Sequence, residues 1–464
     1  MMRYEEYKPT GTAWIEFIPA TWEHKKISAL FSQRKRKVSD TDYPALSVAK
    51  IGVVPQLANA AKSNDSENRK LVCAGDFVIN SRSDRKSSCG VAQQDGSVSL
   101  INIVLTPRQE WNSRYVHYLL RSQPFSEEYY RYGRGIVSDL WTTRYSEMKN
   151  ILLPVPPRKE QDQIVRYLDW QVSKLNALIA AKKHEINLLE EERQALIDTF
   201  VLRSLHEKET KVSSLSWDIS IPLTWNAYKF NQIFNFGKGL AITKANLLSS
   251  GTPVISYGQV HSKTNTGTSI DDSLIRYVSE DYIQSAPNAL VHEGDFIFAD
   301  TSEDYQGVGN CVYVDRDDTL FAGYHTVIAR PKDNKARRYL AYLFLSSAWR
   351  YSLRKQVNGV KVYSITQRIL KNTCVILPPE DEQEKIVALL DEQCARIGAL
   401  KQRIHEEIEH FHELRTRLIS DVVTGQIDVR GIEVPDFNMV EETDSDEENL
   451  DDEDAAEETE EQEE

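Results

Sequence analysis

Two stretches of the chain place apolar residues at alternating intervals of three and four positions. The first extends from Val165 to Phe200 and the second from Val387 to Val422, and nine of the eleven positions in each are apolar. A heptad spacing kept over this length predicts a long helix that pairs with another helix. The alternative is an amphipathic helix that lies on its own lobe, which does not require so strict a spacing. The apolar residues that we expect on the paired faces are Leu168, Val172, Leu175, Ile179, Ile186, Leu189, Leu196, Phe200, Leu390, Ile397, Ile404, Ile408, Phe411, Leu418 and Val422.

Each predicted helix follows a segment with a different pattern. Short apolar runs separated by glycine and turn residues predict strands, for example over Asp76–Asn80 and Asp295–Ala299. Shorter helical stretches, such as Arg114–Arg121 and Ala336–Ser346, are interspersed with them. Each segment is therefore expected to form a compact α+β lobe that ends at a Pro-Pro pair.

The lobes and helices are two copies of one unit. Three stretches recur in the same order, with offsets that grow from 203 to 219 to 222 residues. They are Trp14–Trp22 with Trp217–Trp225, Leu71–Ile79 with Leu290–Phe298, and Pro156–Val165 with Pro378–Val387. Three matches in register indicate a duplicated unit of about 200 residues whose frame is kept while its interior diverges.

The order of these parts predicts the architecture. The second lobe starts about ten residues after the first helix, so the second helix most easily returns antiparallel to the first. The fold class is α+β, with two similar lobes, an antiparallel coiled coil, an internal pseudo-two-fold repeat and a disordered acidic tail. The expected segments are lobe 12–157, helical spacer 158–205, lobe 212–379, helical spacer 380–425 and acidic tail 436–464.

The net charge of −14 comes from the end of the chain. Residues 441–464 hold sixteen Asp or Glu and no Lys or Arg, which leaves 56 basic and 54 acidic residues in 1–440. A body close to neutral is compatible with nucleic-acid binding if its basic residues gather on one face. Five widely spaced cysteines without a CxxC pair argue against a disulfide framework and fit a reducing cytoplasm. There is no apolar run long enough to span a bilayer.

Motifs for catalysis are missing from the sequence. It contains no GxxxxGK[ST] phosphate loop, no HExxH and no Asn-Pro-Pro-Tyr or Asp-Pro-Pro-Tyr motif of the kind used by amino-methyltransferases. The run Phe236–Gly239 is better explained as a turn than as a cofactor loop. His261, His292 and His325 have no matched partner in the first lobe, which favours packed or surface histidines over catalytic bases.

Polar residues that suit DNA recognition follow the Gly-Asp-Phe strand of each lobe. Arg and Lys can donate to guanine, Asn and Gln can bond to adenine, and Asp can accept from cytosine. The candidates are Asn80, Ser81, Arg82, Ser83, Arg85 and Lys86 in the first lobe, and Thr301, Ser302, Asp304, Tyr305 and Gln306 in the second. Their alternative role is that of ordinary solvated loops. Clusters at Arg34–Lys37, Arg337-Arg338 and Arg354-Lys355 could hold phosphates.

With these features together, the chain resembles the specificity subunit of type I restriction-modification systems. The resemblance is carried by Trp14–Trp22, by Pro156–Trp170 and by their copies, and by Val423–Arg430 after the second helix. It extends from about residue 12 to residue 432. It implies two target recognition domains, each reading one half of a split asymmetric DNA site, joined by paired helices.

The resemblance also implies partners that carry the chemistry. Two methyltransferase subunits would bind S-adenosylmethionine and modify adenine, and restriction subunits would use ATP and magnesium. This chain would then have no catalytic residue, metal or cofactor of its own, and would work on double-stranded DNA in a bacterial or archaeal cytoplasm. The acidic tail is not part of the family's pattern.

Three other interpretations remain at this point. The chain could serve a methylation-only complex, it could be a coiled-coil scaffold whose lobes bind protein, or it could be an enzyme with an unrecognised site. The missing motifs argue against an enzyme. A steep fall of DNA affinity with salt would separate DNA binding from a scaffold, because each phosphate contact releases counterions. The recognised sequence and its spacer length cannot be read from the chain.

Overall fold

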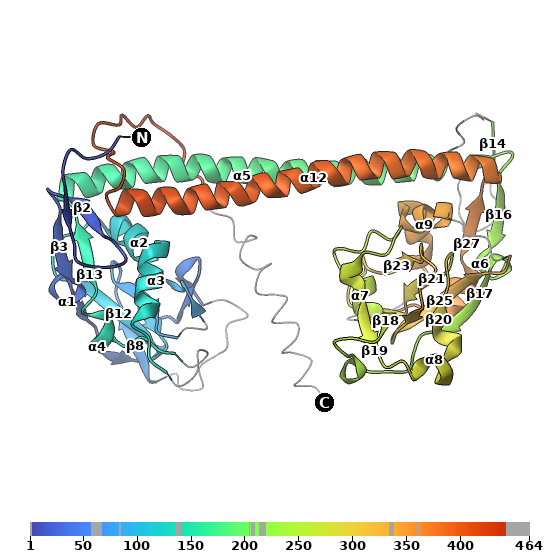
Figure 1. Ribbon diagram of the computed structural model, residues 1–464, viewed down its shortest axis with the longest axis horizontal. Coiled ribbons are helices and arrows are strands. Elements are labelled where there is room, and N and C mark those ends of the chain that lie inside the picture. The colour runs from blue at the N-terminus through green and yellow to red at the C-terminus, as the bar shows by residue number, and fades with distance from the viewer. Residues whose placement is uncertain are drawn as a thin grey trace. The chain divides into compact units, whose positions relative to one another are not determined.

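A computed structural model shows the fold (Figure 1). It describes residues 2–56, 67–82, 85–135, 141–203, 205, 209–212, 220–333, 338–357, 359 and 362–441. The chain divides into two compact units. Unit 1 comprises residues 1–183 and 405–464, and unit 2 comprises residues 184–404. Both long helices therefore contribute one segment to each unit.

Unit 1 is built from short strands and helices around one main sheet. Its strands are β1 (Tyr7–Pro9), β2 (Phe17–Pro19), β3 (Glu23–Lys26), β4 (Phe31–Gln33), β5 (Lys37–Val38), β6 (Leu46–Ala49), β7 (Gly52–Pro55), β8 (Arg69–Val72), β9 (Phe77–Asn80), β10 (Cys89–Val91), β11 (Gly96–Val98), β12 (Asn102–Pro107) and β13 (Leu152–Val155). Its short helices are α1 (Ile27–Leu30), α2 (Ser113–Arg121), α3 (Gln123–Arg131) and α4 (Tyr145–Met148).

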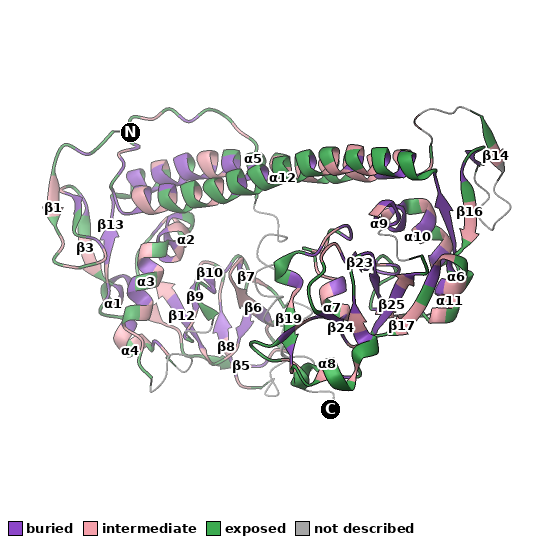
Figure 2. Ribbon diagram, turned by 45° about the vertical axis from the view of Figure 1, so that its right-hand side comes forward, coloured by how far each residue is buried: buried purple, intermediate pink, exposed green. Residues whose placement is uncertain are grey.

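The main sheet of unit 1 has the antiparallel order β10-β9-β12-β4. Phe77, Val78 and Ile79 of β9 are all buried, so this strand is covered on both faces (Figure 2). The core on one face includes Tyr115 and Leu119 of α2. A second sheet, β11-β8-β5, and the β6-β7 hairpin pack against the main sheet through the side chains that α2 does not cover. Together they form a smaller apolar cluster.

Unit 2 repeats this plan, with one more strand than unit 1 among the residues that the structure describes. They are β14 (Thr210–Val212), β15 (Ser220–Pro222), β16 (Asn226–Lys229), β17 (Phe234–Lys238), β18 (Thr252–Ile255), β19 (Arg276–Val278), β20 (Leu290–Val291), β21 (Phe296–Ala299), β22 (Thr301–Ser302), β23 (Cys311–Tyr313), β24 (Leu320–Ala322), β25 (Thr326–Pro331), β26 (Tyr363–Ser364) and β27 (Cys374–Leu377). Its helices are α6 (Phe230–Ile233), α7 (Tyr257–Val260), α8 (Tyr282–Ser285), α9 (Arg338–Leu345), α10 (Ser347–Arg354) and α11 (Gln367–Asn372), with 3-10 turns η3 (Lys244–Asn246), η4 (Asp272–Leu274) and η5 (Pro287–Ala289).

The main sheet of unit 2, β17-β25-β21-β23, matches that of unit 1 strand for strand and is also antiparallel. The extra residues of the second copy lie between β17 and β21. Strands β18, β19 and β20 of this stretch join β24, which follows β23, in a second four-stranded sheet, β19-β18-β24-β20, in which β18 and β24 run parallel. The divergence of the interior is thus concentrated beside the main sheet, and the sheet itself is kept.

The long helices are α5 (Arg158–Phe200) and α12 (Glu380–Val423). In unit 1, Lys182 of α5 contacts Glu407 of α12, with 2.9 Å between Nζ and Oε2. In unit 2, Lys401 of α12 contacts Glu190 of α5, with 2.6 Å between Nζ and Oε2. Rising numbers on α5 thus meet falling numbers on α12, so the helices pack antiparallel (Figure 1). The expected α+β class, with two β-rich units and two long helices packed against each other, is confirmed.

The side chains expected on the helix seam are all buried or half-buried. Leu168 and Ile179 are examples from unit 1, and Leu390 and Ile397 are examples from unit 2. The polar residues that interrupt the apolar spacing have partners of opposite charge or hydrogen-bonding partners, as Lys182 and Lys401 show above. Arg415 likewise donates to the Asn176 side-chain oxygen at 3.0 Å. This accommodates the polar positions without leaving a bare charge at the seam.

A repeated hydrogen bond explains why the tryptophan motif recurs. The fully buried indole of Trp22 donates to Glu160 in the first turn of α5, at 3.0 Å. Trp225, which is equally buried, donates to Glu382 in the first turn of α12, at 2.9 Å. A carboxylate is favourable at a helix N-terminus, and here it also satisfies the buried N–H. Each lobe is thereby joined to the start of its own long helix.

The chain continues beyond α12 as a segment bound to unit 1, which we call the strap (residues 427–440). Gly425 adopts a φ of 77°, which ends the helix, and the Asp428 amide then donates to the Met2 carbonyl. Ile427, Val429 and Val434 are buried in the core of unit 1. Residues 436–441, assigned to the tail from the sequence, therefore belong partly to this bound segment. The remainder of the predicted disordered tail, 442–464, lies outside the described residues.

Candidate nucleic-acid interface

The predicted DNA-binding loop of unit 1 leaves the sheet at the end of β9. Ser81 is buried and donates from Oγ to the Ile101 carbonyl at 2.7 Å, so it holds the loop and does not face solvent. The half-buried Asn80 accepts from the Arg82 amide at 3.0 Å. Arg82, Arg85 and Lys86 are exposed, and Ser83 lies outside the described residues. Three of the predicted residues are therefore presented outward.

The hydroxyl of Tyr130, a residue of α3, holds the backbone of this loop. It accepts from the Ser87 amide at 3.2 Å and donates to the Arg85 carbonyl at 3.3 Å. The Lys86 ammonium lies 5.9 Å from the centroid of the Tyr130 ring, a distance typical of a cation–π contact. The loop backbone is thus held against α3, which limits the directions in which Arg85 and Lys86 can point.

Further exposed cations adjoin this loop, and sequence reasoning missed them. The backbones of Arg82 and Arg134 both pair with Thr142, so the loop, the end of α3 and the segment before α4 come together. Arg144 is exposed two residues further on. We call Arg82, Arg85, Lys86, Arg134 and Arg144 the basic patch. Glu147 lies near it: the pKa of this carboxyl is lowered mainly by a hydrogen bond from Ser146, and Arg134 and Arg144 contribute.

Trp141 gives the basic patch an aromatic surface. Its side chain is 42% exposed and precedes Thr142 directly. Gly133 lies beside it, since an added Cβ there would be 2.9 Å from the Tyr130 carbonyl and 3.6 Å from the Trp141 ring. An exposed indole among arginines is suited to stack on a base or a sugar. No periodic pattern marks residues 131–144, which is why only the excess of Arg could have signalled this region.

The corresponding loop of unit 2 is held differently. Thr301–Ser302 forms strand β22, which pairs with β26. The His261 ring contacts the Thr301 carbonyl through Nε2 at 2.8 Å, which requires the proton on Nε2 because a carbonyl only accepts. Ser302 is buried and donates to the Asp304 carbonyl at 2.7 Å. His261 is therefore a structural residue of this loop and not a base.

The tip of the loop in unit 2 presents an aromatic side chain. Tyr305 is 42% exposed, and its ring centroid lies 5.5 Å from that of Tyr363. The Arg354 guanidinium of α10 lies 5.7 Å from the Tyr305 ring and donates to the Gln306 carbonyl. The Asp304 carboxylate accepts from the Gly307 amide, and Gln306 is exposed. Of the predicted residues, Asp304, Tyr305 and Gln306 face outward, whereas Thr301 and Ser302 support the backbone.

A hollow of about 600 Å³ opens beside this loop in unit 2. It is lined by Lys238–Ile242, Asp300, Tyr324–Val327 and Ser364–Arg368. The Asp300 carboxylate accepts from the Thr301 hydroxyl at 2.8 Å and pairs with the exposed His325 ring at 3.3 Å. At its edge, a Cβ on Gly239 would lie 1.8 Å from the Gly323 carbonyl. Phe236–Lys238, expected with Gly239 to be a turn, form the end of strand β17, and close backbone packing explains Gly239.

The basic clusters read from the sequence need a correction. Arg34 does not face solvent as a phosphate ligand, because its guanidinium binds the buried Asp76 carboxylate through two hydrogen bonds of 2.7 and 3.1 Å. Arg338 pairs with Asp391 at 3.0 Å. Arg354 is occupied by Tyr305 and Gln306. The buried Asp76 carboxylate needs a cation nearby, and this requirement explains the position of Arg34. Arg337 lies outside the described residues.

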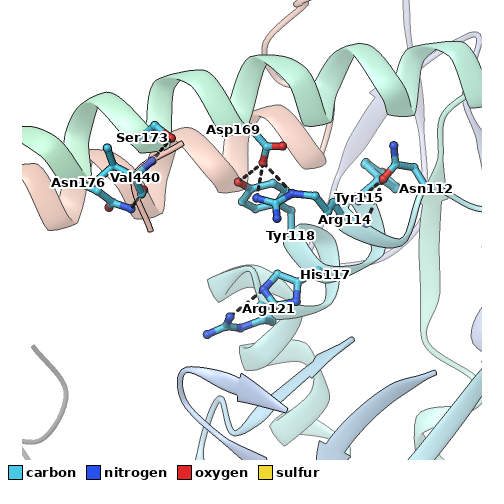
Figure 3. Close-up of polar contacts among 10 residues, drawn as sticks. All are labelled: Asn112, Arg114, Tyr115, His117, Tyr118, Arg121, Asp169, Ser173, Asn176 and Val440. Carbon is cyan, nitrogen blue, oxygen red and sulfur yellow. Dashed lines mark hydrogen bonds and ion pairs between the residues drawn. The ribbon is translucent and has the colours of Figure 1, made fainter. Parts of the chain in front are cut away.

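A repeated cluster connects each lobe to its long helix, and it too was missed. In unit 1, Arg114 and Tyr118 of α2 donate to Asp169 of α5 at 2.7 and 2.8 Å (Figure 3). In unit 2, Arg338 and Tyr342 of α9 do the same to Asp391 of α12, with 3.0 Å for the arginine. Burial, with the carboxylate next to it, raises the pKa of both tyrosines. In the sequence, this cluster could have been found because the arginine and the tyrosine both recur at an offset of 224 residues.

His117 lies on α2 below this cluster (Figure 3). Its Nε2 faces the Arg121 guanidinium at 2.8 Å. Burial, together with Arg121 and Arg114, lowers the pKa of His117 to about 3. The ring is therefore neutral at ordinary pH, and its position away from the outward-facing loops gives it a packing role.

The sequence is similar to sequences of known proteins. Residues 222–410 match the family model of the type I restriction modification DNA specificity domain. The specificity subunit of type I restriction enzyme MjaVIII from Methanocaldococcus jannaschii is 21% identical over 61% of this chain and 64% of its own length. That of EcoKI from Escherichia coli K12 is 21% identical over 60% of this chain and 58% of its own length. The chain thus covers less than two thirds of these relatives.

A solved structure has a similar fold. A structure described as the basis of complex assembly and conformational transition of the type I R-M system aligns with a TM-score of 0.62 at 16% identity, over 88% of this chain and 99% of that one. The shared features are two β-rich units and two long helices that pack against each other. The chain is similar to the specificity subunits of type I restriction-modification systems, and its residues 222–410 match the DNA specificity domain of that family. Among the described residues, no helix is both long and apolar enough to cross a membrane.

Proposed function

We propose that the chain binds a bipartite, asymmetric DNA site and reads one half-site with each unit. The observation that carries this proposal is the outward face of the two loops, which occupy the same place in the repeated frame but carry different side chains. The outward-facing Arg85 and Lys86 of unit 1 correspond, at the offset of 219, to Asp304 and Tyr305 of unit 2. Two copies with identical loops would instead suit a palindrome.

The two sets of side chains favour different base edges. In unit 1 the cations can donate to guanine O6 and N7 or to phosphates, and Trp141 can stack. In unit 2 the Asp304 carboxylate can accept from cytosine N4 in addition to the Gly307 amide. Gln306 can bond bidentately to adenine.

The chain itself is non-catalytic in this proposal, and its partners act on the bound DNA. Two methyltransferase subunits with S-adenosylmethionine would methylate adenine, and restriction subunits with ATP and magnesium would cleave. Support for two copies of one partner comes from the helices. Leu178 of α5 and Leu400 of α12, 47% and 39% exposed, stand at the offset of 222. Lys174 and Arg396, one turn earlier, repeat the flanking charge.

The deciding experiment exchanges one reader. Residues 24–148 are replaced by the matching region of a related subunit, and adenine methylation is mapped in cells that also express the methyltransferase subunit. One half of the methylated site should change, while the other half and the spacer stay. A change in both halves would contradict independent readers.

A second measurement tests DNA binding itself. Fluorescence anisotropy with a random-sequence duplex should show affinity falling steeply with salt, because phosphate contacts release counterions. Affinity that is absent at every salt concentration would favour the scaffold alternative. Methylation without cleavage in a cell that expresses every neighbouring subunit would identify a methylation-only complex.

A further inference from the structure

The strap carries the end of the described chain onto one face of α5. Gln163 of α5 donates to the Val429 and Ile432 carbonyls at 3.0 and 2.7 Å. Two α5 residues then hold the last strap residue: the Val440 amide donates to Ser173 Oγ at 3.1 Å, and Asn176 donates to the Val440 carbonyl at 2.9 Å (Figure 3). The end of the strap is therefore attached to unit 1 at a defined point.

Everything that follows this point is strongly acidic. Residues 441–464 contain sixteen carboxylates and no basic side chain. A segment of 23 residues can reach at most about 80 Å when fully extended. A compact unit with the number of residues of unit 1 is only about 45 Å across. Residues 442–464 can thus reach any surface of the unit to which they are attached.

Unit 1 offers these carboxylates a complementary surface. The basic patch brings five cationic side chains together around Tyr130 and Thr142, and all five are exposed. Attachment to the same unit makes their encounter intramolecular, which raises the local concentration of carboxylates to the millimolar range or so. Multiple weak ion pairs between exposed groups are screened at high salt, so the contact is reversible.

The matching surface of unit 2 has the opposite character. At the offset of 219, Asp304 stands where unit 1 has Arg85, and Tyr305 stands where it has Lys86. Asp300 and Glu303 add further negative charge there. Like charges repel, so this surface does not compete for the acidic residues.

We propose that residues 442–464 dock on the basic patch of unit 1 when DNA is absent and compete there with DNA phosphates. The docking is electrostatic and needs no defined conformation of the acidic residues. Its consequence is selective: non-specific DNA binding through unit 1 is weakened, whereas a cognate half-site displaces the segment. The competition with DNA rests on the proposed function, but the docking itself does not.

The docking is tested on the full-length protein without DNA. A zero-length carbodiimide joins carboxylates to lysines in contact, and peptide mass spectrometry identifies the linked residues. We expect links from 442–464 to Lys86, lost at high salt, and none to Lys355, the exposed lysine at the equivalent end of α10 in unit 2. Equal labelling of Lys86 and Lys355, or links that persist at high salt, would overturn the docking site.

The competition is tested by anisotropy with a random-sequence duplex. A chain that ends at Glu441 keeps the strap and should bind about five- to tenfold more tightly at low salt, with the two affinities converging at high salt. A full-length chain with Asn and Gln at every acidic position of 442–464 should match the truncated chain, which separates charge from length. Unchanged affinity at every salt concentration would overturn the competition.

A third variant gives the basic patch the residues that unit 2 has at the matching positions. Arg85→Asp with Lys86→Tyr should bring the full-length and truncated chains to the same affinity, because the acidic residues lose their docking site. Lys355→Thr, the control in unit 2, should leave the difference between the two chains intact. If the truncated chain fails to bind DNA at all while the cross-links to Lys86 are present, the proposed function fails and the docking stands.

Discussion

In unit 1 the loop after β9 places a lysine over a tyrosine of α3, whereas in unit 2 the loop after β21 places a tyrosine beneath an arginine of α10. The two contacts have similar lengths, 5.9 and 5.7 Å, and occupy equivalent places. Only the direction of the cation–π contact is reversed. The loop is held in the same way in both units, yet it offers a cation to the surroundings in one and an aromatic ring in the other. A frame can therefore be kept while the group that it presents changes.

The buried carboxylate after each glycine turn shows the same principle inside the protein. Asp76 and Asp295 are both 2% exposed. Arg34, at the end of β4, neutralises Asp76, and Thr106 of β12 adds a hydrogen bond of 2.8 Å. In unit 2, Gly237 stands in place of Arg34, and Arg330 of β25, in place of Thr106, binds Asp295 at 2.8 Å. The fold requires a cation beside this carboxylate but not a particular strand to supply it.

The largest effect is expected when unit 2 is removed. A fragment of residues 1–208 lacks Leu418, Val422 and Val423, which complete the core of unit 1. A second copy offers Leu196, Phe200 and Val201 at the equivalent places, so the fragment should form a closed antiparallel dimer with two identical readers. Its methylation target should become an inverted repeat of one half-site.

Sedimentation of the fragment, followed by methylation mapping with the methyltransferase subunit, measures this outcome. Lys182 lies near the centre of the seam, and in the dimer it would face its own copy. A Lys182→Leu fragment is the informative companion, because it should dimerise more tightly. A monomer at micromolar concentration would contradict the expected pairing.

Next in size is the loss of a buried carboxylate. Asp295→Ala leaves Arg330 without its partner and should lower the free energy of unfolding of unit 2 by about 3 kcal/mol. A double variant, Gly237→Arg with Arg330→Thr, keeps Asp295 and rebuilds the arrangement of unit 1. This double variant should be more stable than Arg330→Thr alone, despite the 3.3 Å approach of a Cβ to Ile328.

Hydrogen exchange, read separately for the amides of each unit, distinguishes these variants. Exchange in unit 1 serves as the internal control and should be unaffected. Should Gly237→Arg bring no recovery over Arg330→Thr, the idea that either strand can supply the cation is wrong.

Acid should weaken the two units unequally. The pKa of His117 is about 3 in the folded chain because of burial and two arginines, and about 6.5 when unfolded. The unfolded state therefore binds more protons below that value, and stability falls as the pH drops from 6.5 toward 3. Between pH 7 and 5 this residue alone should cost unit 1 about 2 kcal/mol.

The equivalent position in unit 2 is the buried Ala341, which supplies the matched variant. His117→Ala should flatten the pH dependence of unfolding of unit 1 over this range, as followed by exchange or by denaturant titration at pH 7 and 5. An unchanged slope would mean that His117 does not control the acid sensitivity of unit 1.

The smallest expected effect reverses one cation–π contact. Tyr305→Lys with Arg354→Tyr gives unit 2 the arrangement of unit 1, and should change stability by less than about 0.5 kcal/mol because one cation–π pair replaces another. DNA recognition should change more, by about 1–3 kcal/mol for the half-site that unit 2 reads. Methylation mapping of the variant should show relaxed or altered bases in that half-site alone.

The sequence predicted those parts of the molecule that repeat. Heptad spacing predicted α5 and α12, and the recurring Trp-to-Trp and Pro-Pro motifs marked the joints that Trp22–Glu160 and Trp225–Glu382 form. Spacing cannot show which side of a loop faces solvent, so Ser81 and Ser302 were grouped with residues that point outward. Nor does it show which cations folding neutralises, as Arg34 and Arg338 illustrate. Trp141 and Arg134 lacked any pattern, because their surface is created by strand pairing with Thr142.

Unit 1 is made from the two ends of the chain, while unit 2 is a single continuous stretch from residue 184 to residue 404. During synthesis the first lobe emerges early, but Leu418, Val422 and the strap that finish its core emerge last. Unit 2 can thus complete its contacts while unit 1 still waits, with the seam of α5 uncovered. Closing unit 1 joins segments more than 200 residues apart, a slow step in chain collapse. A ribosome that stalls before residue 405 would release a chain whose second reader is folded and whose first is unfinished.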